Sequence, residues 1–182
     1  MAHRFEPAPT GRAKCRGCGR PIAQGELRFG ETLPNPFADG EMTAWFHPLC
    51  AAYKRPAPLL EALAQAGERA SGRERLERAA HASLAHPRLP RIDGAARAAS
   101  GQAKCRSCRE PIARGSWRIR VAFHEDGRFA PGGYVHLACR EAYFGTADIR
   151  EQLLHFSPDL DEQERGELAR ALDAGPAGAS TQ

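Results

Sequence analysis

The chain has few aromatic residues and no long hydrophobic run. Phe, Trp and Tyr make up 7% of its 182 residues, and 18 glycines and 14 prolines interrupt it. This composition does not supply two large apolar cores, so small domains here would need another source of stability, such as a bound metal. No run of 18 apolar residues is present, so we expect no membrane-spanning helix. The segment Met1–Pro7 lacks the apolar core of a signal peptide, which predicts an intracellular protein.

No cysteine is left outside one pattern, which the chain uses twice. The two sets are Cys15, Cys18, His47 and Cys50, and Cys105, Cys108, His136 and Cys139. The second and third members are separated by 28 residues in the first set and by 27 in the second. Three thiolates and one imidazole are the ligands of a closed tetrahedral zinc site with no open position for a reacting molecule. We predict two structural Zn²⁺ ions; iron or three disulfide bonds are the alternatives.

The repeat extends beyond the ligands. The segment 10–15 parallels 100–105, and the segment 21–25 parallels 111–115, both at an offset of 90 residues. Two tandem homologous units follow from this periodicity. We expect a first zinc finger with a following helix pair at 1–86, a linker at 87–99, a second finger with its helix pair at 100–175, and a disordered tail at 176–182.

Within each unit the pattern predicts short strands followed by helices. Residues 27–30 and 117–123 have strand character, and His124–Gly127 is typical of a hairpin turn. Apolar residues at helical spacing predict helices within 58–66 and 71–84, the second opened by a capping box at Ser71 and Glu74. A second pair of helices is expected near 149–156 and 160–172, and the last helix is expected to have an N-terminal cap within 159–162. The fold class expected is therefore two small α+β domains stabilised by zinc.

Positive charge lies mainly with the cysteines. Residues 1–56 carry 8 Lys and Arg against 5 Asp and Glu, and residues 101–145 carry 8 against 4. Residues 146–182 carry 3 against 8. A basic surface suits a phosphate backbone, although an imbalance of this size favours nucleic acid only weakly.

Several motifs together resemble the zinc finger of poly(ADP-ribose) polymerases, which is also found on a nuclear DNA ligase. In the first unit the similar segments are Thr10–Cys15, Ile22–Arg28, Phe37–Gly40 and Trp45–Cys50. In the second unit Phe156–Gln163 resembles the start of the family's C-terminal helix. The resemblance covers about residues 4–55 and 98–173. It implies a short antiparallel sheet, a C-terminal helix and one structural zinc per finger, and binding to broken or nicked duplex DNA without base-sequence preference.

The resemblance also implies roles for individual residues. Arg12 and Arg28 match arginines that grip phosphates, and Phe37 matches a loop side chain that stacks on the base pair exposed at a break; Met42 is a second loop candidate. The alternatives are ordinary surface arginines and a phenylalanine that packs on the zinc core. Further candidates for DNA contact come from the residues themselves. These are Lys14, beside the first ligand, and Arg118 and Arg120 in the second unit.

The second unit departs from the family pattern. Gln102 stands where the first unit has Arg12, and the acidic turn His124–Gly127 replaces the loop that carries Phe37. An acidic turn repels phosphate, so we expect the first unit to bind DNA ends better. The second unit would bind the DNA backbone or a protein.

Two functions remain open from the sequence. The first is a non-catalytic protein that recognises DNA strand breaks, in the cytoplasm or nucleoid of a bacterium or the nucleus of a eukaryote. The alternative is a protein-interaction adaptor that uses the second unit or the acidic C-terminal helices. No nucleophile–base set, phosphate loop or carboxylate cluster for a second metal is recognisable, so neither an enzyme nor a small-molecule substrate is expected.

Overall fold

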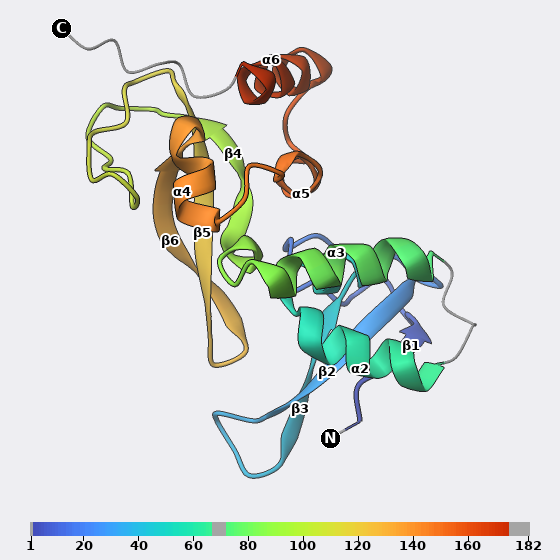
Figure 1. The fold of residues 1–182 in the computed structure, drawn as a ribbon. Helices are drawn as coiled ribbons and strands as arrows, with labels where there is room; N and C mark the ends of the chain where they lie inside the picture. The colour runs from blue at the N-terminus through green and yellow to red at the C-terminus, as the bar shows by residue number, and fades with distance from the viewer. Residues whose placement is uncertain (1, 67–71, 175–182) are drawn as a thin grey trace, which may run out of the picture. The chain divides into compact units, whose positions relative to one another are not determined.

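The computed structural model describes residues 2–66 and 72–174. The chain divides into two compact units, the first formed by residues 1–90 with 124–129 and the second by residues 91–123 with 130–182. Each unit contains one three-stranded antiparallel sheet and several helices (Figure 1). This confirms the predicted class of two small α+β domains. Within the described ranges, every helix is too short or too polar to cross a membrane.

The sheet of the first unit has the order β1-β2-β3. Its strands are β1 (Arg4–Pro7), β2 (Leu27–Pro34) and β3 (Glu41–Phe46). Phe29 on β2 pairs with Phe46 on β3, and both side chains are fully buried. The segment between β2 and β3 contains Phe37, at the end of a hairpin that extends beyond the helices in Figure 1.

Three helices complete the first unit; the first two lie against this sheet, and the third packs on those two helices (Figure 1). They are α1 (Pro48–Lys54), α2 (Pro56–Ala66) and α3 (Arg73–Ala85). Leu59 and Leu63 of α2 are completely buried, and Leu76 and Ala80 of α3 form the facing stripe. The helix pair predicted from apolar spacing is confirmed, although Ser71 of the expected capping box lies outside the described residues.

The sheet of the second unit repeats the first, with the order β4-β5-β6. A short 3₁₀ turn, η2 (Leu89–Arg91), leads into β4 (Ile92–Arg97), followed by β5 (Trp117–Glu125) and β6 (Arg128–His136). Strand β4 lies inside the segment expected as a linker at 87–99, so much of that segment belongs to the second unit's sheet. The predicted hairpin turn is confirmed, with positive φ values at Asp126 (48°) and Gly127 (73°) as a type I′ turn requires.

The second unit ends with short helices. They are η3 (Leu137–Cys139), α4 (Arg140–Phe144), α5 (Arg150–His155) and α6 (Glu162–Asp173). Asp161 caps α6 by accepting a hydrogen bond from the Glu164 backbone, and the Glu164 side chain accepts one from the Asp161 backbone. This capping box lies where the sequence predicted a cap. The tail expected to be disordered, 176–182, lies outside the described residues.

Candidate metal centres and nucleic-acid interface

The first cysteine set converges on one point in the first unit. Cys15 and Cys18 lie on the turn before β2, His47 follows β3, and Cys50 lies in the first turn of α1. The imidazole Nδ1 of His47 is 3.4 Å from the Cys18 sulfur and 3.9 Å from the Cys50 sulfur. Cys15 and Cys50 are buried and the other two ligands are partly buried, so the cluster is largely closed to solvent.

The second set forms the same arrangement in the second unit. Nδ1 of His136 is 3.4 Å from the Cys108 sulfur and 3.8 Å from the Cys139 sulfur. Cys105 is buried, but Cys108 is exposed, so this cluster is more open than the first. The difference in exposure predicts a difference in how easily the two metal ions are removed.

Both clusters have the dimensions of a tetrahedral zinc site. Within each cluster all four ligand atoms lie within 4.8 Å of one another. Zinc bonds of about 2.3 Å to sulfur and about 2.0 Å to nitrogen, at tetrahedral angles, place sulfur and nitrogen about 3.5 Å apart. The observed sulfur–nitrogen distances bracket this value, and all six cysteines are free thiols, which excludes the disulfide alternative. Each unit thus carries a Cys₃His site for a structural zinc ion.

Groups around each cluster orient its histidine. Nε2 of His136 donates to the carbonyl oxygen of Pro111 at 3.1 Å, which leaves Nδ1 for the metal. Nε2 of His47 faces a carboxylate oxygen of Glu26 at 3.8 Å. A carbonyl or carboxylate behind the ligating imidazole is the usual outer-shell partner of zinc histidines, because it sets the tautomer and raises ligand basicity.

The turn between the first two cysteines has the same backbone in both units. The residue after the second cysteine takes a left-handed conformation, with φ of 74° at Gly19 and 70° at Arg109. This bend brings the backbone N–H of that residue to the carbonyl of the first cysteine, at 2.8 Å in the first unit and 3.0 Å in the second. The repeated bend explains why each first pair of thiols points to one place despite different intervening residues.

Thiol and imidazole pKa values in the protein without metal are strongly perturbed. Hydrogen bonds with Cys15 and Cys18 raise the pKa of His47 to about 10. Burial opposes ionisation of Cys105, but backbone N–H groups of His136, Cys108 and Ser107 lower its pKa to about 7. A preformed thiolate favours metal binding, and zinc must displace the proton held by His47. Zinc affinity therefore falls as the solution becomes more acidic.

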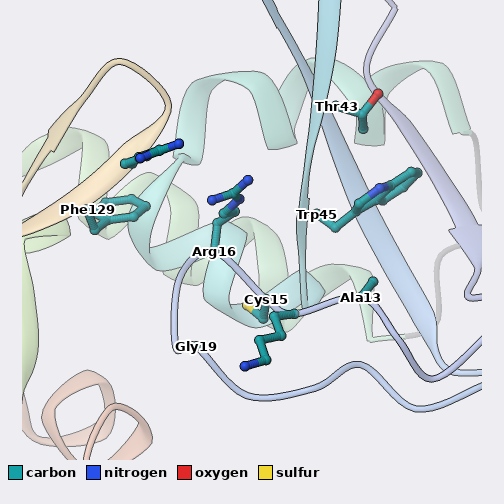
Figure 2. A pocket seen from close by; sticks show the side chains of 9 residues that line it. Ala13, Cys15, Arg16, Gly19, Thr43, Trp45 and Phe129 are labelled. Carbon is teal, nitrogen blue, oxygen red and sulfur yellow. The ribbon is translucent and has the colours of Figure 1, made fainter. Parts of the chain in front are cut away.

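A basic pocket lies beside the first zinc cluster. It encloses about 590 Å³, and Lys14, Arg16, Thr43 and Trp45 contribute to its lining. Figure 2 shows the Arg16 side chain between Trp45 and Phe129, and all three residues line this pocket. Arg16 was not among the sequence candidates, although the basic residue after the first cysteine recurs as Arg106 and was a usable signal.

The first-unit candidates differ in their accessibility. Arg12 and Lys14 are exposed and have no ion-pair partner within 2–66 and 72–174. Phe37 is 74% exposed on the hairpin between β2 and β3. Met42 is partly buried on β3, where it pairs with Leu33. The alternative that Phe37 packs on the zinc core does not agree with this exposure.

Arg28 is positioned differently from these residues. Only 7% of it is exposed, its guanidinium donates to a carboxylate oxygen of Glu6 at 2.5 Å, and it lies 3.5 Å from the centre of the Trp45 ring. Arg28 donates to Glu6, and this lowers the pKa of that carboxyl. Sequence reasoning missed Glu6, because its pairing with Arg28 depends on the register between β1 and β2.

The second-unit candidates also differ from each other. Arg118 lies 3.6 Å from the centre of the Tyr134 ring and is partly exposed. Arg120 donates through Nε to the main-chain carbonyl of Asp93 at 3.1 Å, which connects β5 to β4. Arg120 therefore has a structural partner that the sequence did not indicate.

Comparison with known proteins agrees with the metal sites. Residues 6–86 match the family model described as the poly(ADP-ribose) polymerase and DNA-ligase Zn-finger region. The chain is 26% identical to a poly [ADP-ribose] polymerase of Sarcophaga peregrina over 196 aligned residues, which cover 94% of this chain and 20% of that protein. A poly [ADP-ribose] polymerase 1 of Caenorhabditis elegans is 39% identical over 57 residues, covering 28% of this chain and 6% of the relative.

A further relative, poly [ADP-ribose] polymerase 1 of Gallus gallus, is 40% identical over 48 residues, covering 26% of this chain and 5% of the relative. The chain thus spans about a fifth or less of the length of these relatives. The family match runs from within β1 to the end of α3 and includes the whole first metal cluster, and the second unit repeats that cluster and its sheet order. Residues 6–86 are therefore similar to the poly(ADP-ribose) polymerase and DNA-ligase Zn-finger region, and they are followed by a second unit with the same Cys₃His ligand set.

Proposed function

We propose that this chain is a non-catalytic, zinc-dependent DNA-binding protein that recognises strand breaks or ends. The observation that carries the proposal is the solvent-exposed Phe37 on a hairpin of a zinc-stabilised finger. A phenylalanine that is 74% exposed contributes little to the core and leaves most of its ring accessible to a partner. A break exposes a base-pair face that an intact duplex hides, and an aromatic side chain can cover that face.

Exposed cations on the same unit support DNA rather than a neutral partner. Arg12 and Lys14 are exposed and lack ion pairs within the described residues, and Arg16 lines the pocket beside Trp45. Such side chains attract phosphates without regard to base sequence, and they make binding dependent on salt. Met42, Arg28, Arg118 and Arg120 are further candidates. Glu6 holds the Arg28 guanidinium and the main-chain carbonyl of Asp93 accepts from Arg120, whereas Arg118 stacks on the Tyr134 ring and has no ion pair among the described residues.

The adaptor alternative has weaker support. One of its supports is the acidic C-terminal region, beside Gln102 and the helix pairs, yet several of these carboxylates have partners within the second unit. Glu167 accepts from Arg97 at 2.5 Å, Asp173 accepts from Arg150 at 3.0 Å, and Glu164 caps α6. These three carboxylates of α6 therefore have partners within their own unit, which leaves less charge for a protein partner.

A competition experiment tests the proposal. The labelled probe is a duplex with one central nick, and the competitors are the same duplex without the nick and closed circular DNA, all at 150 mM salt. The proposal expects nicked or blunt-ended DNA to compete much better than closed circular DNA. Equal competition by all DNAs would reject break recognition, and absence of binding would reject nucleic acid as the partner.

A further inference from the structure

The two units share a pair of side chains outside the metal sites. In each, an arginine on the middle strand of the sheet stacks on an aromatic ring of the next strand. Arg28 of β2 lies 3.5 Å from the centre of the Trp45 ring, and Arg118 of β5 lies 3.6 Å from the centre of the Tyr134 ring. Nε is buried and has no hydrogen-bond partner in either arginine. The two arginines therefore occupy equivalent positions in the two sheets, and each makes the same stacking contact with an aromatic ring.

The cross-strand neighbour of this arginine differs between the units. In the first unit Arg28 pairs in register with Glu6 of β1, and in the second Arg118 pairs with Ala96 of β4. The carboxylate of Glu6 lies 2.5 Å from the Arg28 guanidinium. An alanine offers no charge, and Arg118 has no ion-pair partner within the described residues.

Accessibility changes with the neighbour. Arg28 is 7% exposed, whereas Arg118 is partly exposed. A carboxylate and a phosphate compete for the same N–H edge of a guanidinium, since both accept its hydrogen bonds in the same planar geometry. A phosphate that approached Arg28 would have to displace Glu6, but one that approached Arg118 would meet no internal competitor.

We propose that the residue opposite this arginine sets which unit holds the DNA backbone. Glu6 acts as an internal competitor that keeps Arg28 from binding phosphate, and Ala96 leaves Arg118 available to a phosphodiester. The inference rests on the proposed DNA-binding function and assigns a division of labour within it. The first unit supplies the stacking residue Phe37, and the second unit supplies the stronger phosphate contact from this position.

Reciprocal substitutions test the proposal in the full chain. The probe is a nicked duplex, and the affinity is measured over a series of salt concentrations. The salt dependence of log K changes by about 0.9 per phosphate contact. Ala96→Glu is expected to weaken binding and to reduce the slope by about this amount. Because Arg4 also donates to Glu6, at 2.9 Å, Glu6→Gln is compared in an Arg4→Ala background, where it is expected to strengthen binding and to increase the slope by about the same amount.

Matched variants separate this effect from net charge. Ala147→Glu adds the same charge at an exposed position of the second unit, and Glu74→Gln removes the same charge from an exposed position of the first unit's α3. Both should change the slope much less than the test variants. In an Arg118→Ala background, Ala96→Glu should have no further effect on the slope, because the arginine that the new carboxylate would pair with is absent. Zinc content verifies that each variant is folded.

The outcomes distinguish the inference from the proposed function. If the unsubstituted protein does not bind DNA, both are rejected. If it binds but Ala96→Glu and Glu6→Gln behave like their matched controls, only the inference is rejected. If Ala96→Glu fails to load zinc, Glu6→Gln alone decides, and an unchanged salt slope in that variant overturns the inference.

Discussion

Substitution of Phe37 by alanine should separate DNA recognition from folding. Complete burial of a phenylalanine side chain stabilises a fold by about 1.5–3 kcal/mol. Because 74% of Phe37 is exposed, its truncation should remove only about a quarter of that stabilisation. The free energy of unfolding should therefore fall by less than about 1 kcal/mol. Stacking on a base is worth about 1–3 kcal/mol, so affinity for nicked DNA should fall by about 5- to 150-fold.

The assay compares fluorescence anisotropy with a labelled nicked duplex and urea unfolding followed by circular dichroism. Leu84 is the other large exposed hydrophobic side chain among the described residues, at 46%, and it lies on α3. Leu84→Ala is therefore the matched control and should leave DNA affinity unchanged. If Phe37→Ala bound nicked DNA normally, or if it lost more than about 1 kcal/mol of stability, the stacking role would be refuted.

Three further predictions concern stability. Arg55→Ala should lower the free energy of unfolding by about 3 kcal/mol in urea titrations, because it leaves the carboxylate of Glu31, which is 1% exposed, without its ion-pair partner; a loss below about 1 kcal/mol would contradict this. Gly94→Ala should prevent stable folding of the second unit, since the residue has φ of 103° and a Cβ there would overlap a main-chain carbonyl beyond α5; a thermal transition like that of the unsubstituted chain would show the reasoning to be wrong. Arg28 lowers the pKa of Glu6, so the ion pair stabilises the fold above pH 4.5, the ordinary pKa of a glutamate, and this stabilisation is lost as the pH falls through the lowered pKa. Between pH 6 and pH 3 the melting temperature should therefore fall less steeply in Glu6→Gln than in the unsubstituted chain. Parallel curves of melting temperature against pH would refute the linkage.

The features that the sequence predicted were those set by local chemistry. The ligand sets could be identified because cysteine and histidine spacing reports a metal site directly. The hairpin turn and the cap of α6 were predicted because turn and cap residues act on their own backbone. The helix pairs followed from apolar spacing.

The features that the sequence missed depend on contacts between distant residues. Strand β4 is rich in small residues and has no alternating pattern, so it is defined by pairing with β5 rather than by its own preference. The ion pair between Glu6 and Arg28 joins residues on different strands, and its existence depends on their register. Because the burial of Arg28 also depends on this register, it could not be predicted from the sequence motif that suggested a phosphate contact.

The most direct test of the account is the metal content of the purified chain and its consequence for folding. We expect two zinc ions per chain by elemental analysis. A chelator should remove them in two steps, the more exposed site of Cys108 first, and the loss of both should abolish the cooperative thermal transition. A chain that contained no zinc, or that kept its full thermal transition after both ions were removed, would contradict the central claim.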